Sequence, residues 1–276
     1  MATAPLGSEP DASARERLLL AIEASTARLT ATIATLNAGA LAGPSRLGGW
    51  DRRTIVAHLA YVATAYVRVT ADVLAGRPAS SYPGGSAERA RSLHSLDGCS
   101  PADSAERFRT AADELRDRWA RLEPPQWERR FVEGRIGAMA LARLIPLRLT
   151  ELEVHGSDLD AGLEIAGWSD ALVSICLPLR VAWLPVHHRD RPDAALTCDG
   201  SWLLRATDTG ARWLVQARGP DAWCRVAGAR DDAEGEIAGP ARSLLAYLLG
   251  RMPPDPPAAV GGEVALVRFK RAFPGP

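Results

Sequence analysis

Apolar residues recur at intervals of three and four along the first part of the chain, which is the spacing of one face of an α-helix. Ser100 followed by Pro101 is a strong helix start. The pattern predicts four long helices, over about 11–37, 51–76 and 100–122 and from near Gly137 to about 163, the last kinked at Pro146. Because most links between these helices are short, the sequence favours an up-and-down four-helix bundle.

A polar segment rich in glycine, proline and serine separates the second and third helices. It spans residues 77–100 and predicts a long loop. A long loop in a compact domain is often a lid over a functional site, although a plain solvent-exposed connection is at least as common. His94 could reach a site beneath such a lid, but a solvated loop histidine is the commoner case.

The pattern of apolar and polar residues changes after about residue 165. An apolar helix is predicted around 170–184, and short alternating runs follow, over 194–200, 201–208, 211–218, 222–228 and 233–239. These runs indicate a small, mostly antiparallel sheet, followed by a helix over 240–252 and a final strand or helix over 263–273. The sequence therefore predicts an α+β protein with a helical domain over 1–164 and a smaller α+β domain over 165–276.

Composition narrows the class of protein. Hydrophobic residues make up 47% of the 276 positions, and 33 acidic residues balance 33 basic ones, which predicts a neutral globular protein with no nucleic-acid partner. No secretory signal pattern begins the chain, and no uninterrupted apolar run approaches the roughly 20 residues of a membrane span. We therefore expect a cytoplasmic protein with no membrane partner.

Two further biases in composition indicate which kind of metal site is excluded and what the source of the protein is. The four cysteines are scattered without a CxxC pair, which fits free thiols and excludes a zinc ribbon. Lys270 is the only lysine among the 33 basic residues. Such a preference for arginine is typical of a GC-rich genome and would suit an actinobacterium.

Six charged side chains interrupt the apolar pattern of the fourth helix, in the stretch 146–163. A helix turns about 100° per residue, so Arg148, Glu151, His155 and Asp158 share a sector about 80° wide. This sector borders the apolar face of the helix, where charges are costly unless they are paired or bind a metal.

The other two acidic residues of that stretch fall outside the sector. Glu153 lies about 200° from Glu151 around the helix, so we expect it to face solvent. Asp160 is also expected to be an ordinary solvent-facing residue.

The pair of Glu151 and His155, four residues apart, can supply two ligands of a transition metal. Such a pair is more often a surface hydrogen bond or salt bridge. His58, however, lies on the apolar stripe of the second helix. A lone histidine on an apolar face is more often a core residue whose hydrogen bonds are satisfied than a metal ligand. Metal sites of helical bundles are built from inward-facing side chains of different helices, so the three residues together are candidate metal ligands.

The same residues carry a resemblance to a known family. Trp50 and His58 on one helix, followed on another by Arg148, Glu151, His155, Asp158 and Leu159, resemble the mycothiol-dependent maleylpyruvate isomerase family of DinB-like metalloenzymes. The stretch GPARSLLAYLLGR, at 239–251, is similar to part of that family's C-terminal module, which has a sterol-carrier-protein-like α+β fold.

The resemblance implies a function. His58, Glu151 and His155 would bind a divalent metal, usually zinc, and mycothiol would be the cosubstrate. A thiolate formed at the metal would attack a small electrophile, giving either cis-trans isomerisation or a thiol S-conjugate. Arg148 and Asp158 would support the cofactor site by orienting its ligands.

The resemblance also implies an active-site arginine from the C-terminal module. Arg251 is the candidate for this catalytic role, with Arg242 and Arg268 as rivals. The long segment 77–100 departs from simpler members of the family, so maleylpyruvate itself is not carried over as the substrate. The oligomeric state is expected to be a monomer or a small homo-oligomer.

Two other functions fit the same sequence. A non-catalytic module that binds a small molecule or a partner would use the polar sector for structure only. A metal-dependent hydrolase on the same bundle would activate water in place of a thiol. The adjacent His187 and His188 lack a cysteine or glutamate at ligand spacing, which disfavours a second metal site there.

Overall fold

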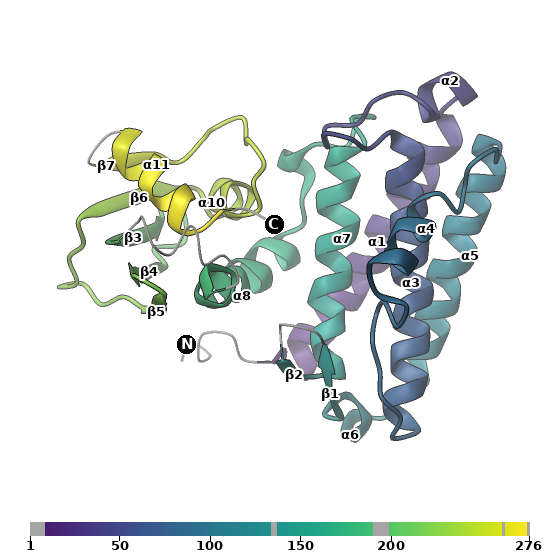
Figure 1. The fold of residues 1–276 in the computed structure, drawn as a ribbon, viewed down its shortest axis with the longest axis horizontal. Helices are drawn as coiled ribbons and strands as arrows, with labels where there is room; N and C mark the ends of the chain where they lie inside the picture. Colours follow the sequence, from purple (N-terminus) through teal and green to yellow (C-terminus); the bar gives the residue numbers. More distant parts are fainter. Residues whose placement is uncertain (1–8, 134–136, 190–198, 261–262, 275–276) are drawn as a thin grey trace. The chain divides into compact units, whose positions relative to one another are not determined.

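The computed structural model describes residues 9–133, 137–189, 199–260 and 263–274. Contacts divide the chain into two compact units, one over Glu9–Ser169 and one from Asp170 onward (Figure 1). The predicted boundary after residue 164 precedes this division, because Trp168 and Ser169 hydrogen-bond to Glu153 and so belong to the first unit.

The first unit contains the four long helices that the apolar pattern predicts. Asp51 and Ser100 cap two of them by accepting a hydrogen bond from the backbone N–H of the third residue after each. The helices of this unit are α1 Ala12–Thr35, α2 Ala38–Leu41, α3 Arg52–Leu74, α4 Gly85–Leu93, α5 Pro101–Ala120, α6 Pro124–Trp127 and α7 Leu144–Asp158.

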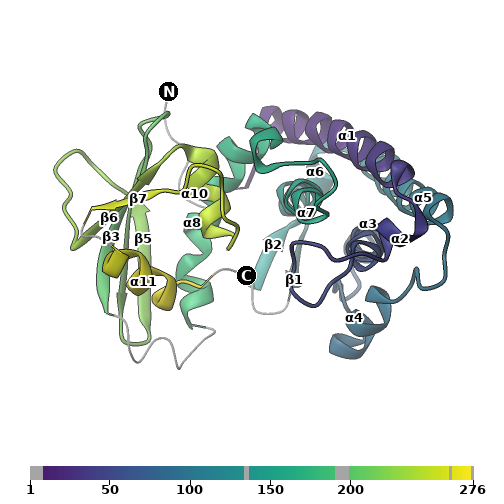
Figure 2. The ribbon, with the colours of Figure 1, turned by 90° about the horizontal axis from the view of Figure 1, so that it is seen from above.

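The order of the helices around the bundle differs from the prediction. Both α1 and α3 pack against α5 and α7, which places α1 and α3 on a diagonal (Figure 2). Glu9, just before α1, pairs with Arg143, just before α7, so these two helices start at the same end. Thr70 near the end of α3 accepts from Trp119 at the end of α5, so these two also run in parallel. The predicted up-and-down order is therefore wrong.

The long connection between α3 and α5 is the physical reason for this order. Two parallel neighbouring helices can be joined only if the chain returns along the length of the bundle. Residues 75–100 make that crossover, and they contain α4, which packs against α3. The prediction of a structureless loop is thus wrong for residues 85–93.

The start of the fourth long helix also differs from the prediction. Gly137 begins a strand, β2 Gly137–Ala140, which pairs antiparallel with β1 Arg130–Glu133. A short 3-10 turn, η2 Leu141–Arg143, leads into α7. Pro146 therefore lies in the first turn of α7, where a backbone N–H has no intrahelical acceptor, and the predicted kink has no cause.

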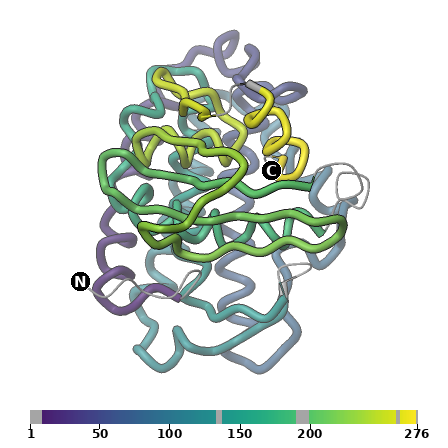
Figure 3. Tube along the Cα trace, turned by 90° about the vertical axis from the view of Figure 1, so that its left-hand side faces the viewer, coloured from purple at the N-terminus to yellow at the C-terminus, as the bar shows by residue number. Residues whose placement is uncertain are grey.

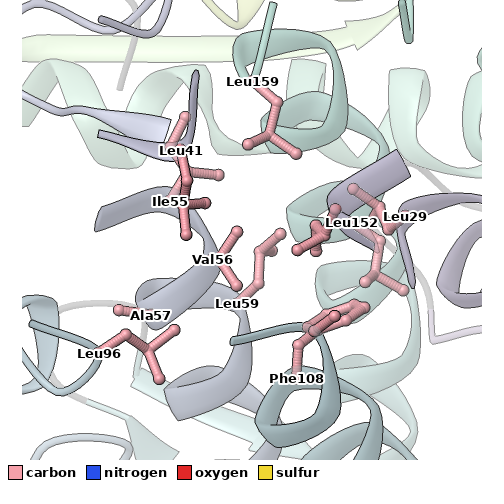
Figure 4. Packing of buried hydrophobic residues seen from close by; sticks show 12 residues of the cluster. Leu29, Leu41, Ile55, Val56, Ala57, Leu59, Leu96, Phe108, Leu152 and Leu159 are labelled. Atoms are coloured by element: carbon pink, nitrogen blue, oxygen red, sulfur yellow. The ribbon is translucent and has the colours of Figure 1, made fainter. Parts of the chain in front are cut away.

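The core of the bundle is aliphatic and contributed by all four long helices. Ile33 of α1, Leu59 of α3, Phe108 of α5 and Leu152 of α7 are fully buried in one cluster. Figure 4 shows Leu59 and Leu152 side by side in that cluster. Burial of these side chains fixes α3 against α7, the two helices that carry the candidate ligands.

The second unit is α+β, as the alternating runs predict. Its elements are α8 Asp170–Arg189, β3 Gly200–Ala206, β4 Arg212–Arg218, β5 Asp221–Val226, β6 Gly235–Gly239, α10 Ala241–Leu248, β7 Ala258–Val260 and α11 Glu263–Ala272. The described strands form one sheet in the order β5-β4-β3-β6-β7, and among them only the β3–β6 pair is parallel. Figure 3 shows β3, β4 and β5, drawn in green, lying side by side.

Most of the run 194–200 lies outside the described residues. The segment 263–273, for which strand and helix were both open, is the helix α11. Its end packs on the sheet, since Phe269 and Phe273 both contact the ring of Trp202.

In the part of the chain that the structure describes, three helices, α1, α3 and α8, are long and apolar enough to cross a bilayer when judged by length and composition alone. In α3, 67% of the apolar window is buried inside the protein. Packing within the bundle therefore accounts for the apolar character of the helix that carries His58.

Candidate metal centre

The start of α3 is fastened to the end of α7. Arg52, the first residue of α3, donates from Nε to the carbonyl of Leu159 at 2.6 Å and from Nη2 to that of Asp160 at 2.9 Å. These are carbonyls at the end of a helix, which have no intrahelical donor. Arg46, in the preceding loop, donates its backbone N–H to the carbonyl of Asp158 at 2.8 Å. Because α3 and α7 are antiparallel, this junction sets the early turns of α3 beside the late turns of α7.

The junction brings the three predicted ligands together. His58 Nε2 lies 2.9 Å from Glu151 Oε2, and His155 Nε2 lies 3.2 Å from the same oxygen. One potential ligand atom from each residue falls within 4.8 Å of the others. His58 is 6% exposed and Glu151 retains 28% of its side-chain exposure, so the cluster is buried but open on one side.

The electrostatics of the cluster favour an ionised carboxylate. Burial would raise the pKa of Glu151, but hydrogen bonds from His155 and His58 and the charges of both rings hold it well below its usual range. Burial lowers the pKa of His155, and this is outweighed by hydrogen bonds to Asp158 and Glu151, which raise it to about 9. The carboxylate therefore carries a negative charge between two imidazoles at neutral pH.

Two neighbouring side chains fix the orientation of the rings. His155 Nδ1 donates to Asp158 Oδ2 at 2.9 Å, which turns Nε2 toward Glu151. The ring of Trp50 stacks on His155 with centroids 6.0 Å apart, and it meets His58 edge-on at 5.2 Å. The tryptophan ring therefore packs against both imidazoles.

The donor set fits a divalent transition metal. One carboxylate oxygen and two imidazole nitrogens are ligands that zinc accepts, and three protein ligands leave a fourth position open. The hydrogen bond from His155 to Asp158 is the carboxylate–histidine arrangement that commonly supports a metal-bound histidine. His58 Nδ1, by contrast, is buried with no hydrogen-bond partner among the described residues.

Arg148 is buried against the backbone of α3. It is 1% exposed, and its Nη1 donates to the carbonyl of Leu59 at 2.8 Å. Burial lowers its pKa to about 10, opposed by the charges of Tyr66 and Glu151. Arg148 thus links α7 to α3 at Leu59, the residue after His58. The charge of Glu151 also acts on the Arg148 guanidinium.

Glu153 is not the solvent-facing residue that its position on the wheel predicts. It is 5% exposed, and its carboxylate accepts from Ser25 Oγ at 2.7 Å and from the backbone N–H of Ser169 at 2.6 Å. Arg28 lies 3.5 Å away. The far side of α7 is covered by α1 and by residues 165–169, so both faces of this helix are interior. Asp160 is exposed, as expected.

The candidate arginines of the second unit differ in their contacts. Arg242 pairs with Asp170 at 3.1 Å and Arg268 with Glu234 at 3.3 Å. Arg251 is partly buried and donates from Nη1 to the carbonyl of Leu249 at 2.6 Å. Each of the three belongs to the second unit, and a role in the metal centre stays a prediction for all of them.

The remaining histidines have partners of their own. His94 is exposed and lies 3.2 Å from Asp97. His187 Nε2 lies 2.8 Å from Arg180 Nη1. His188 is fully buried between the carbonyls of Ala272 and Gly219, each at 2.9 Å. Among the residues that the structure describes, the only grouping of three or more potential metal ligands is the one around Glu151.

Comparison with known proteins places the first unit in a family. Residues 22–160 match the family described as the mycothiol maleylpyruvate isomerase N-terminal domain. No curated protein matches the chain.

Among solved structures, the chain is similar to the crystal structure of a mycothiol-dependent maleylpyruvate isomerase, at 16% identity and a TM-score of 0.70, over 90% of this chain and 94% of that one. A histidine-to-alanine mutant of that isomerase matches with the same identity and coverage and a TM-score of 0.69. YfiT from Bacillus subtilis, titled a probable metal-dependent hydrolase with an unusual four-helix bundle topology, matches at 20% identity and a TM-score of 0.47, over 60% and 95%. The first two likenesses show a shared fold.

Proposed function

The chain belongs to the mycothiol maleylpyruvate isomerase N-terminal domain family, and on this basis we propose that it is a mycothiol-dependent metalloenzyme acting on a small electrophile. The proposed reaction is thiol S-transfer or cis-trans isomerisation. Both reactions begin with the attack of a thiolate on an electrophilic carbon.

The observation that carries the proposal is the convergence of His58, Glu151 and His155 from two helices on one point. A purely structural role would not require two imidazoles to share one carboxylate oxygen, at 2.9 and 3.2 Å. The family assignment supplies the thiol, and the donor set supports a divalent metal, for which zinc is our proposal.

Each side chain of the site would have a distinct role in this reaction. A metal held by the three ligands would lower the pKa of a thiol bound at its open position and so supply a thiolate at neutral pH. Asp158 would keep the proton of His155 on Nδ1 and leave Nε2 free as a ligand. Arg148 and Trp50 would hold α3 and the two rings in place, and Arg251 of the second unit would contact the substrate.

We further propose that the protein works in the cytoplasm and without a nucleic-acid or membrane partner. Cys99 and Cys224 are free thiols, which suits a reducing compartment. Cys198 lies outside the described residues. The balanced charge of the chain offers no excess of basic residues for a polyanion.

The test is elemental analysis of the purified protein followed by a conjugation assay with mycothiol and a panel of electrophiles. We expect one metal per chain and turnover that depends on both metal and thiol, with both lost in His58→Ala. Full metal content in His58→Ala would remove the basis of the site. Turnover that needs no thiol would point to a hydrolase, and a metal-free, inactive protein would point to a binding module.

A further inference from the structure

Lys270 is the only lysine among the 33 lysine and arginine residues of the chain. It lies in the last turn of α11 and is half-buried. Its Nζ donates to the carbonyl of Tyr247, near the end of α10, and lies 4.0 Å from the centroid of the Tyr247 ring. A guanidinium can donate to a carbonyl and cover a tyrosine ring as well as an ammonium can. These two contacts therefore give no reason for a lysine in place of an arginine.

The property that separates the two side chains is the ability to lose a proton. Arginine stays protonated in proteins, whereas a lysine amine that is buried or lies beside another cation can become a neutral nucleophile. A second cation is held close to Lys270, because Arg180 is 6% exposed and donates to the carbonyl of Leu248, the residue after Tyr247. Burial, with a further contribution from the charge of Arg180, lowers the pKa of Lys270 to about 8. Burial also raises the pKa of Tyr247, so its phenol stays neutral and offers the amine no negative charge.

The amine of Lys270 lines a cavity within the second unit. This cavity has a volume of about 370 Å³, and its walls are Tyr247, Leu266, Val267, Lys270 and Arg271. Leu266 and Val267 supply apolar surface, while Arg271 is exposed and, among the described residues, has no carboxylate partner. Sites for small molecules are commonly hollows of this size, with apolar walls and a few polar groups. An amine and a guanidinium in one such hollow suit a small molecule that carries both a carbonyl group and a carboxylate.

We propose that Lys270 is a reactive amine that forms a Schiff base with a small oxo acid, an aldehyde or ketone whose carboxylate is bound by Arg271. The lone pair of the neutral amine forms a C–N bond with the carbonyl carbon, and one proton moves from nitrogen to the former carbonyl oxygen, which gives a carbinolamine. The hydroxyl group and the remaining nitrogen proton then leave as water, so an amine and a carbonyl compound give an imine and water without oxidation or reduction. This site goes beyond the proposed function, since it lies in the second unit and needs neither metal nor mycothiol.

Reductive trapping tests this inference cleanly, because Lys270 is the only side-chain amine of the chain. Glyoxylate, an aldehyde with a carboxylate, and glycolaldehyde, a neutral aldehyde of similar size, are each added to the full-length protein at pH 7 with cyanoborohydride, which reduces an imine to a stable secondary amine. Peptide mass spectrometry measures the adduct at Lys270 separately from the adduct at the amino terminus. Glyoxylate should be trapped at Lys270 about tenfold or more faster in the folded protein than after unfolding in guanidinium chloride, where the amine regains its ordinary pKa.

Arg271→Gln tests the bound carboxylate. It should lower the ratio of the glyoxylate rate to the glycolaldehyde rate at Lys270 about tenfold, the loss expected when charge-assisted hydrogen bonds are removed. Arg218→Gln is the matched control, at an exposed arginine of β4 that does not line the cavity, and should leave the ratio unchanged. Trapping of Lys270 that is no faster in the folded than in the unfolded protein overturns the reactive amine. A ratio that Arg271→Gln leaves unchanged overturns the oxo acid as the ligand. Neither result depends on turnover with mycothiol, so failure of this inference is distinct from failure of the proposed function.

Discussion

His155 Nδ1 lies 2.9 Å from Asp158 Oδ2, one turn further along the same helix, and this contact orients a predicted metal ligand. Asp158 is 2% exposed, so its carboxylate is protected from competition by water. In Asp158→Asn the amide is a weaker acceptor and can offer its NH2 group to the ring, which would favour the wrong tautomer of His155. We expect zinc affinity to fall about 10- to 100-fold, as for other outer partners of metal-bound histidines.

Competition with a chromophoric chelator would measure that affinity. Asp117→Asn is the control, since Asp117 is an exposed aspartate of α5 whose partner is Arg116. Equal zinc affinities in the two variants would show that the contact with Asp158 does not support the metal.

Metal binding should depend on pH through His155. In the metal-free protein its pKa is raised to about 9, so the ring is protonated at neutral pH and a metal must displace that proton. Apparent zinc affinity should therefore rise about tenfold per pH unit up to about pH 9 and then level off. A chelator titration at several pH values would show this slope, and a flat profile between pH 7 and 9 would contradict it.

The same shift makes the opposite prediction for the stability of the metal-free protein. The folded-state pKa of about 9 exceeds the usual value of 6.5, so protonated His155 stabilises the fold. This contribution is complete below about pH 6.5 and is lost as the pH rises through about 9. Urea unfolding of metal-free protein across that range should show the loss, and Asp158→Asn should reduce it.

The helical wheel placed the predicted ligands correctly relative to one another because helical periodicity is local. Glu151 and His155 share a face whatever surrounds the helix, and His58 stood out by its position in an apolar stripe. The wheel failed for Glu153 because it does not tell which faces of a helix are covered. The cover comes from α1 and from residues 165–169, which are distant in sequence or beyond the helix.

The direction of the helices and the placement of Arg89 could not be predicted for a related reason. Periodicity identifies a helix but not its neighbours, and the one local signal for parallel packing was the length of the segment 77–100. Arg89 of that segment lies over the ring of Trp50, and Tyr82 stacks on Tyr61. Both are tertiary contacts, which no period in the segment marks.

Replacing Glu153 should destabilise the protein without removing the metal. Glu153→Gln substitutes an NH2 group for one carboxylate oxygen, so either Ser25 or the N–H of Ser169 loses its acceptor in a buried place. We expect the free energy of unfolding to fall by about 1–3 kcal/mol, with zinc content unchanged. Glu128→Gln, at an exposed glutamate, should change it by less than about 0.5 kcal/mol. Similar unfolding curves for the two variants would argue against a structural role for Glu153.

Arg52 should control metal affinity without touching the metal, because it fastens the start of α3 to the end of α7. In Arg52→Gln the bonds to the carbonyls of Leu159 and Asp160 are lost, and those carbonyls have no other donor from within the helix. The first turns of α3 should then move relative to α7, which widens the distance between His58 and Glu151. We expect zinc affinity to fall about tenfold, by analogy with other supporting contacts, and the free energy of unfolding to fall by about 1–3 kcal/mol.

Arg77→Gln, at an exposed arginine that pairs with Asp72 near the other end of α3, should leave zinc affinity unchanged. Chelator competition on both variants checks the prediction, and full affinity in Arg52→Gln would mean that packing of the core alone positions His58.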